Sequence, residues 1–392
     1  MLIREYRGAA DDADLYRIRR LAFGGPRESE GPQDHFSYRP EGHWALVAEH
    51  DGEPVGCVRV RNYHQFFGGA AVPMGGLSTV AVDAHARGHG VANAMLDAVL
   101  PGLRDRGQSI SALFPSVPPL YRGRGWEQAG TNERVTLHPN ALARLPKPAT
   151  RPAMRRLRKD DLPAIHQAYV TYASTVDGML DRSEPGFNHA DYLDLDIVDL
   201  VPGPDGILGY LWAERTSDTK ISCNDLVALD RDTALGLLHN LSLWAGNIEE
   251  ISLRIIDPAW WDLVVDQPVE HEKHNHPWML RVVDLPVAVA ARGWPLAAHL
   301  ADLSVDIEVI DEHAPWQAGR HRLVVESGTV RCERGGSGAV QLSARALGPW
   351  YAGSADTAML RRAGLLSGDQ AQARLLDVLT GAPHVVMMGN AF

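Results

Sequence analysis

The chain has few cysteines, no long apolar run and no excess of positive charge. Its three cysteines, Cys57, Cys223 and Cys332, lie far apart in 392 residues, without the spacing of a metal site or a disulfide framework. We therefore expect buried free thiols. No apolar run reaches the roughly 18 residues that a membrane-spanning helix needs, so we expect no membrane partner.

The balance of charge argues against a second class of partner. The formal net charge is -11, whereas a surface that binds nucleic acid needs an excess of lysine and arginine. Residues 1–20 include Asp11, Asp12 and Asp14 and so lack the apolar centre of a secretory signal. We expect a cytoplasmic protein that does not bind nucleic acid.

The length and the prolines predict several domains. At roughly 100 to 200 residues per domain, 392 residues correspond to two or three domains. Three prolines in 145–157 interrupt any regular element and mark a linker. We predict an α/β (α+β) fold of three units, 1–147, 148–285 and 286–392, with 277–294 leading into the last.

The first two units share one order of predicted elements. The first unit has helix 12–23, strands 45–50 and 54–63 about the turn Asp51-Gly52, strand 71–82, helix 91–107 and strand 110–116. Pro101 should kink or split helix 91–107. The second unit repeats this plan without a glycine turn, through helix 159–175, strand 206–215, helix 231–246 and strand 250–256. The third has strands 303–311 and 321–333, with a turn at Glu326-Ser327-Gly328, and a helix near 368–381.

A turn rich in glycine joins strand 71–82 to helix 91–107. Its residues fit the pattern R-x-x-G-x-A and are Arg87, Gly88, His89, Gly90, Val91 and Ala92. The first backbone N–H groups of a helix have no partner within the helix, and with the helix dipole they bind phosphate. We predict a phosphorylated ligand here; the alternative is a turn that only connects strand and helix.

The order of elements around this turn, followed by 120-LYRGRGW-126, resembles the GNAT acyltransferases. The resemblance implies acetyl-CoA as co-substrate, with its pyrophosphate on the glycine turn. It also implies that the backbone of Val80, Ala81 and Val82 contacts the pantetheine arm, and that Ser116 lies near the cofactor and the acceptor.

More narrowly, the whole chain resembles the Eis family of actinobacterial N-acetyltransferases. The stretches 71–91, 278–285 and 346–353 carry this resemblance, together with the length and layout of the chain. It implies a catalytic GNAT domain, a second GNAT-like domain without the cofactor loop, and a sterol-carrier-like domain whose C-terminus reaches the catalytic site. It further implies a homo-hexamer.

The resemblance also implies two catalytic groups. Tyr121, before a glycine-rich turn, would donate a proton to the departing thiolate, since a phenol with a pKa of about 10 keeps its proton beside a thiol near 8.5. The main-chain carboxylate of Phe392 would accept the proton of the amine. The alternatives are a tyrosine that only packs and a C-terminus that only docks.

The expected function is acetyl-CoA-dependent N-acetylation of a primary amine, on a small cationic molecule like an aminoglycoside or polyamine, or on a lysine-bearing peptide. A dedicated biosynthetic acceptor, or a non-catalytic protein that binds acyl-CoA or an apolar ligand, remains an alternative. Acidic residues for a cationic acceptor could come from Glu28, Glu30 and Asp34. A polar surface loop without metal is expected at His271, His274 and His276, whose spacing matches no zinc site.

Overall fold

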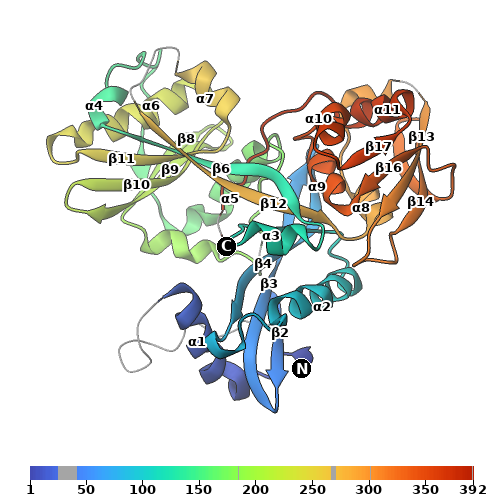
Figure 1. Ribbon diagram of the computed structural model, residues 1–392. Helices are drawn as coiled ribbons and strands as arrows, with labels where there is room; N and C mark the ends of the chain where they lie inside the picture. The colour runs from blue at the N-terminus through green and yellow to red at the C-terminus, as the bar shows by residue number, and fades with distance from the viewer. Residues whose placement is uncertain (25–41, 184, 266–270, 301, 391) are drawn as a thin grey trace.

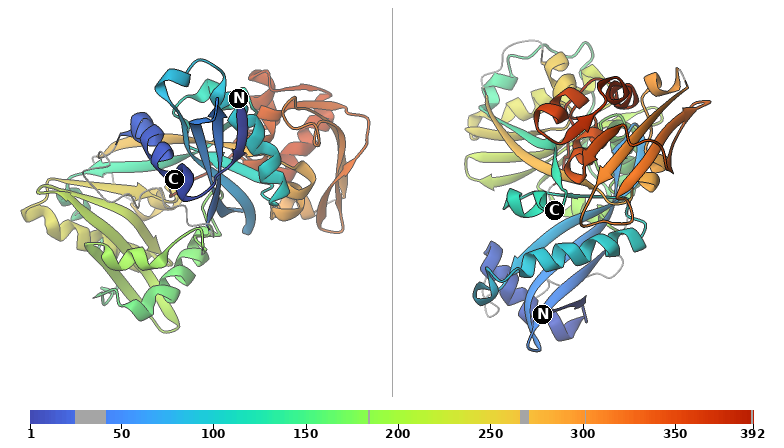
Figure 2. Two further views of the ribbon diagram at one scale, coloured as in Figure 1. Left: turned by 90° about the horizontal axis from the view of Figure 1, so that it is seen from below. Right: turned by 45° about the vertical axis from the view of Figure 1, so that its right-hand side comes forward.

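Three parts of the chain surround the C-terminus in the computed structural model, which describes residues 1–24, 42–183, 185–265, 271–300, 302–390 and 392. The acidic cluster Glu28, Glu30 and Asp34 lies outside the described residues. In Figure 1 the first part (blue to teal) lies below the second (green to yellow) and the third (orange to red), and the C-terminus returns to the region between them. Figure 2 shows the same arrangement from two further directions.

The first part follows its predicted elements closely. Helix α1 (Ala9–Phe23) contacts strands β3 and β4. The turn of the first hairpin has φ of 52° at Asp51 and 86° at Gly52, the positive values that a tight hairpin turn requires. The strands are β1 (Leu2–Glu5), β2 (His43–His50), β3 (Glu53–Phe67), β4 (Ala70–Val82), β5 (Ile110–Leu113) and β6 (Glu127–Leu137).

Helix α2 (Val91–Asp105) is continuous through Pro101, so the predicted split of this helix is wrong. A proline removes one helical hydrogen bond, but burial of one face holds the helix together on both sides of it. Val91, Met95, Val99 and Leu103 are buried in one core with strands β2 to β4. Tertiary packing thus outweighs the local cost of the proline.

One sheet of twelve strands runs through the first two parts, in the order β1-β2-β3-β4-β5-β12-β6-β11-β10-β9-β8-β7. Strand β12 (Glu272–Val282) lies between β5 and β6 and is antiparallel to both. The first half of the stretch 277–294 therefore completes the large sheet and does not open the third unit. Residues distant in sequence meet here because the chain returns to the first part after building the second.

The second part repeats the order of the first around helices α5 (Leu162–Ala173) and α6 (Arg231–Ser242). Its strands are β7 (Arg155–Arg156), β8 (Ile197–Gly203), β9 (Gly206–Ser217), β10 (Lys220–Ala228) and β11 (Glu250–Ile255). The sequence did not indicate β8 and β10. Short helices α4 (Pro139–Leu142) and α7 (Pro258–Val264) lie at the ends of this part.

The third part is a five-stranded sheet, in the order β15-β14-β13-β16-β17, with helices beside it. The predicted turn lies between β14 and β15, with positive φ at Ser327 and Gly328. Helix α9 (Ala344–Ala352), which periodicity did not reveal, packs on β6 and β12 of the large sheet. The other elements are β13 (Leu303–Ile310), β14 (Gly319–Glu326), β15 (Thr329–Arg334), β16 (Val340–Ser343), β17 (Leu366–Gly368), α8 (Leu285–Ala291), α10 (Thr357–Arg362) and α11 (Gln370–Thr380).

Two surface expectations need correction. Cys57 and Cys223 are buried, but Cys332 is partly exposed. His274 and His276 lie on strand β12 rather than in a loop, because β12 pairs with β6 from Glu272 to Leu280, and both side chains are exposed. Among the described residues, no three histidine, cysteine or acidic side chains are grouped to hold a metal ion. No helix in the described part of the chain is long and apolar enough to cross a membrane.

Candidate active site

The site begins where two parallel strands separate. Strands β4 and β5 pair only at Met74 with Ile110, Gly75 with Ser111, and Gly76 with Ala112. Strand β4 then continues to Val82, and among the described strands only β3 pairs with it there. The backbone along the other edge of β4 is therefore available to a ligand. We call this separation the β4–β5 opening.

A bulge in β4 shapes this opening. Arg59 of β3 pairs with Ser78 while Cys57 pairs with Ala81, so β4 carries one extra residue between these pairs. Thr79 has φ of 53°, an uncommon value for a residue with a branched side chain. A bulge bends its strand and increases its twist, which directs the following residues away from β5.

The predicted pantetheine contacts follow this bulge. Ala81 is buried against α1, whereas Val80 and Val82 are half-buried against the core of the first part. Ala81 packs on one face of β4, and Val80 and Val82 pack on the other. These side chains hold the strand in place while its edge faces the opening. This placement fits the backbone contacts that the resemblance implies.

The glycine turn lies beyond Val82 at the start of α2. Gly88 and Gly90 have φ of 81° and 78°, and a Cβ at either position would meet no atom within 4 Å. Gly90 is the N-cap, and no side chain caps the helix. The left-handed backbone favours glycine here, and the open space above it leaves the first N–H groups of α2 accessible. Such a cradle fits a phosphate.

The other residues of the turn lie around the same helix start. Arg87 and His89 are exposed, and Arg87 Nε donates to the carbonyl of Val82 at 3.3 Å. Val91 anchors the helix in the core, while Ala92 is half-buried on its first turn. A small side chain there leaves room beside the helix N-terminus. The six turn residues therefore lie together between the end of β4 and the first turn of α2.

A buried carboxylate holds the turn in place. Asp83 is 3% exposed and forms ion pairs with Arg17 of α1 and with His85. Burial works against the charged form, but the bonds from these partners keep the pKa of Asp83 below its usual value. The carboxylate thus stays ionised and joins the turn to α1.

Tyr121 lies on one face of the opening. It belongs to helix α3 (Pro118–Arg122) and is 7% exposed, in a core that includes Leu77 of β4, Leu113 of β5 and residues of α2. Burial raises the pKa of Tyr121 to about 12, because the phenolate would lose its hydration. The hydroxyl therefore keeps its proton at neutral pH.

Phe392 lies on the opposite face. A Cβ on Gly76 would meet the Phe392 ring at 2.8 Å, so the ring packs directly on β4 where the opening starts. Tyr63 and Phe114 contact the same ring edge to face, with centroids 5.3 and 5.8 Å away. Gly75, the residue before it in β4, faces α2 instead. Successive residues of a strand point to opposite faces, so Tyr121 and Phe392 flank the opening.

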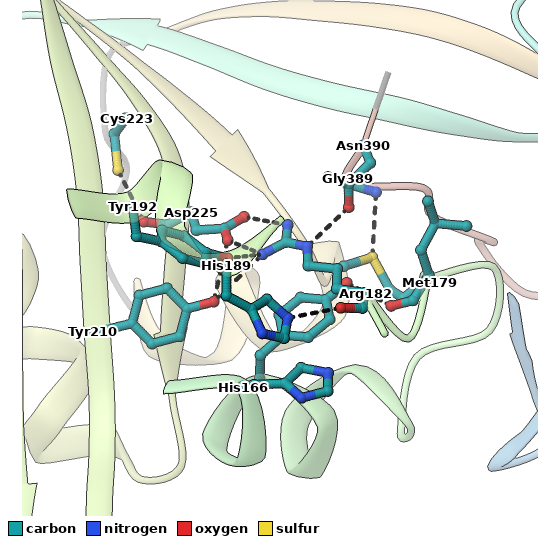
Figure 3. Close-up of polar contacts among 12 residues, drawn as sticks. His166, Met179, Arg182, His189, Tyr192, Tyr210, Cys223, Asp225, Gly389 and Asn390 are labelled. Carbon is teal, nitrogen blue, oxygen red and sulfur yellow. Dashed lines mark hydrogen bonds and ion pairs between the residues drawn. The ribbon is translucent and has the colours of Figure 1, made fainter. Parts of the chain in front are cut away.

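Sequence reasoning missed the residues that bring the C-terminus here. Arg182 is fully buried and donates from Nε to Asn390 Oδ1 at 3.0 Å (Figure 3). The same guanidinium binds both carboxylate oxygens of Asp225 and donates to the hydroxyls of Tyr192 and Tyr210. The Cζ atom of Arg182 lies 3.8 Å from the centroid of the Tyr169 ring. Only Asn390, a polar residue in an apolar end, gave a signal in the sequence.

Backbone contacts fix the same segment on its other side. Met388 donates to the carbonyl of Thr131 and accepts from Asn132 Nδ2, at 3.0 and 2.8 Å. Gly389 N donates to Met179 Sδ at 3.3 Å. The segment therefore lies between β6 of the first part and the core of the second. Its path leads Phe392 to the β4–β5 opening.

Ser116 lies elsewhere than the glycine turn. It follows β5, is exposed, and lines a pocket of about 420 Å³ that the turn residues do not line. Phe114, which contacts Phe392, forms one wall of this pocket, and Arg134 and Arg254 contribute to another. Ser116 therefore lies in this pocket and not at the glycine turn.

Comparisons with known families agree with this geometry. Residues 3–129 match the acetyltransferase (GNAT) domain, and residues 285–388 match the sterol carrier protein domain. An N-acetyltransferase of Streptomyces coelicolor, described as uncharacterised, is 29% identical over 86% of this chain and 88% of its own length.

Solved structures extend the likeness to the whole fold. A GCN5-related N-acetyltransferase from Kribbella flavida is 28% identical, with a TM-score of 0.86 over 100% of this chain and 98% of that one. Eis1 from Mycobacterium abscessus, 23% identical over 100% of both chains, has a TM-score of 0.77 and shares the fold. GNAT acetyltransferases generally use acetyl-CoA. The chain is an acyltransferase of mixed α/β fold, with a GNAT acetyltransferase domain at its start and a sterol carrier protein domain at its end.

Proposed function

We propose that this chain is an Eis-like enzyme that transfers an acetyl group from acetyl-CoA to a primary amine of a small molecule or a lysine-bearing peptide. One observation carries the proposal. The β4–β5 opening lies beside the uncapped start of α2 and has Tyr121 on one face and Phe392 on the other. A thioester placed in the opening would meet an acid from one side and an amine with its base from the other.

The residues present fit acetyl-CoA. The N–H groups at Gly88, Gly90 and the first turn of α2 would hold its pyrophosphate, and Arg87 would add a positive charge beside it. The backbone of Val80 and Val82 would orient the pantetheine arm along the free edge of β4. The cofactor supplies the activated acetyl group as a thioester.

Tyr121 would act as the general acid. With its pKa raised to about 12, the phenol holds its proton far above the pKa of a thiol, about 8.5. It donates only when negative charge develops on sulfur, which is when a proton lowers the barrier. The burial that raises this pKa also excludes water from the hydroxyl.

The carboxylate of Phe392 would accept the proton that the amine loses, directly or through water. Its position is supported by the ring packed on Gly76 and by the bonds that Arg182 and Asn132 make to the preceding residues. A base held by so many contacts needs little reorganisation during the reaction. The sterol carrier protein domain then has a structural reason to be present, because it delivers this terminus.

Two further proposals concern the oligomeric state of the protein and its compartment in the cell. We propose a homo-hexamer, which the Eis resemblance implies, and a cytoplasmic location, which the charge of residues 1–20 favours. A dedicated biosynthetic acceptor fits the same chemistry, since pocket shape rather than catalytic groups selects the amine.

The test is thiol release from acetyl-CoA with a panel of amines. Tyr121→Phe and removal of Phe392 should each lower kcat by roughly a hundredfold, the usual contribution of a general acid or base. Tyr172→Phe is the matched control, because Tyr172 is also 7% exposed but lies on α5, in the core of the second part. This control should keep kcat within about twofold of wild type.

The pH profile separates the acid from a packing role. Since burial raises the pKa of Tyr121 to about 12, its ionisation should not lower the rate below about pH 11, while deprotonation of the amine increases the rate from neutral pH upward. An unimpaired Tyr121→Phe enzyme would show that the acid is another group. Full activity without Phe392 would exclude its carboxylate as the base.

A further inference from the structure

The acceptor side of the opening carries unbalanced positive charge. The pocket of about 420 Å³ beyond β5 is lined by Phe114 and Ser116 on one side and by Arg134, Arg254 and His276 on the other. No aspartate or glutamate among the described residues lines it. A polycationic acceptor would need the reverse pattern of charge.

Arg134 finds only neutral partners. Its Nε donates to Ser252 Oγ at 2.9 Å, Nη1 to Asn224 Oδ1 at 3.0 Å, and Nη2 to Ser222 Oγ at 2.8 Å and to the Cys223 carbonyl at 3.2 Å. These contacts satisfy its N–H groups and fix the side chain across three strands. They leave its charge uncompensated, because among the described residues no carboxylate forms an ion pair with it.

The side chain of Arg254 has fewer hydrogen-bond partners than that of Arg134. Its Nε is buried and has no hydrogen-bond partner among the described residues, although the side chain lines the pocket. Asp225, the carboxylate that attracts it electrostatically, already binds Arg182 through both carboxylate oxygens. Burial, together with repulsion from Arg134 and Arg182 and against attraction by Asp225, lowers the pKa of Arg254 to about 10. The side chain is therefore still charged at neutral pH.

Arg134 and Arg254 thus line the pocket, while Asp225, the carboxylate that attracts both of them, is bound by Arg182. A buried charge without a partner costs several kcal/mol in a protein interior, so such a group is usually matched by an ion that binds. Guanidinium pairs well with the paired oxygens of a carboxylate or phosphate.

We propose that this pocket binds an acidic group of the acceptor, so that the preferred substrate is an amine that also bears a carboxylate or phosphate. The inference rests on the proposed N-acetyltransferase function. Phe114 lies between the pocket and the Phe392 ring. An acceptor with its acidic group beside Arg254 would extend its amine past Phe114 toward the opening.

The experiment compares acceptors that differ by the acidic group alone. Lysine and cadaverine share the terminal amine and differ by a carboxylate, while phosphoethanolamine and ethanolamine differ by a phosphate. Wild-type kcat/KM should be roughly tenfold or more higher for the acidic member of at least one pair, since a charge-assisted hydrogen bond contributes that much. The pair that responds identifies carboxylate or phosphate as the group.

Arg254→Gln should lower kcat/KM for the acidic acceptor by roughly ten- to a hundredfold and leave that for the member without the acidic group within about twofold. Arg254→Lys, which keeps the charge, should retain part of the preference. Arg215→Gln is the matched control, because Arg215 is an exposed arginine of the same part, bonded to the carbonyls of Ser217 and Asp218. Thermal unfolding confirms that each variant is folded.

Three results would overturn the inference. An equal loss for both members of a pair would show that Arg254 serves the chain's own terminal carboxylate. A raised KM for acetyl-CoA alone would assign the charge to the cofactor. Equal wild-type rates for acceptors with and without the acidic group would remove its basis.

If no acceptor is acetylated, the proposed function fails, and calorimetry with coenzyme A present then decides the inference separately. Binding of Nε-acetyllysine, but not of N-acetylcadaverine, that is lost in Arg254→Gln would support an acid-binding pocket. Equal binding of the two compounds, or none, would overturn it.

Discussion

The first two parts of the chain build the same strand-to-helix junction and differ in what satisfies the start of the helix. Helix α2 begins at Gly90, and no side chain caps it. Helix α6 begins at Asp230, whose carboxylate accepts from the Thr233 N–H at 2.8 Å and from its hydroxyl at 2.8 Å. A carboxylate of the chain thus occupies at α6 the place that a phosphate could take at α2.

The strand openings differ in the same way. Strands β10 and β11 pair in parallel from Lys220 to Cys223, as β4 and β5 do. The space beyond is a cavity of only about 10 Å³ lined by Tyr172, Leu226, Arg254 and Trp261. Large side chains fill the position that the first part leaves open. One fold therefore gives an unpaired strand edge or a packed core according to a few side chains.

The second part uses its polar groups to bind the chain itself. Arg182, Asp177 and Met179 contact Asn390, Met387 and Gly389 of the C-terminal segment. The duplicated fold thereby becomes a support for the terminus that enters the first part. This contrast between an open and a filled copy can be tested from both sides.

The largest effect should come from placing a carboxylate at the start of α2 in the first part. Gly90→Asp places at the start of α2 the carboxylate that α6 already has, and repels the pyrophosphate. We expect the Kd for acetyl-CoA to rise by roughly a hundredfold, the value of one or two charge-assisted hydrogen bonds. Calorimetry measures it.

Gly107→Asp is the control for this prediction. Gly107 follows the same helix at its other end, with φ of 72°, and a Cβ added there would meet no atom within 4 Å. The same charge and similar backbone strain are added there without approaching the cofactor. A Gly90→Asp protein that binds acetyl-CoA as tightly as Gly107→Asp would disprove the role of this helix start.

A smaller effect should follow from removing the carboxylate that caps α6 in the second part. Asp230→Ala removes the cap of α6 and should lower the free energy of unfolding by about 1 kcal/mol. We expect kcat and the KM for acetyl-CoA to stay unchanged, because the side chains around Tyr172 still fill the opening. Denaturant unfolding and steady-state kinetics check both statements. Asp205→Ala, in an exposed turn of the same part, controls for loss of charge, and a changed KM would contradict the contrast.

The smallest effect concerns one contact of the terminal segment. His384 Nε2 lies 3.0 Å from Asp177 Oδ2, and this bond, against the effect of burial, raises the pKa of His384. Although burial acts against it, the bond from His384 helps lower the pKa of Asp177. The stabilisation from His384 is therefore complete below about pH 6.5, its unfolded pKa, and is lost as pH rises through the raised value.

We expect His384→Gln to lower the free energy of unfolding by about 0.5 kcal/mol at pH 6 and by less at pH 9, since the histidine is partly exposed. Urea unfolding at the two pH values provides the measurement. His50→Gln in the first part removes an exposed histidine near Asp51 and should have no such pH dependence. A larger effect at pH 9 than at pH 6 would contradict the assignment.

Local patterns predicted the first part best. The hairpin at Asp51-Gly52, strand β4 and the glycine turn carry their signals within a few residues, because turn chemistry and periodicity are local. Strand β10 and helix α9 were missed. Long-range packing determines these elements: β10 lies between two partners, and α9 is buried on β6 and β12.

The candidate site divides in the same way. The glycine turn at the start of α2 could be predicted because six consecutive residues form it. The Arg182 network, the insertion of β12 and the charge around Arg254 join residues far apart in the chain. No pattern in a single sequence indicates which arginine will be buried beside which carboxylate.

The sequence by itself determined the glycine turn, the hairpins and the likeness to GNAT acyltransferases, because backbone conformation and local periodicity follow from neighbouring residues. Only the tertiary structure decided which residues hold the chain's end at the β4–β5 opening, and that two arginines and no carboxylate of the described residues line the pocket beside Ser116. Those features depend on which distant groups meet in a water-poor interior, where burial makes each pairing of charges decisive.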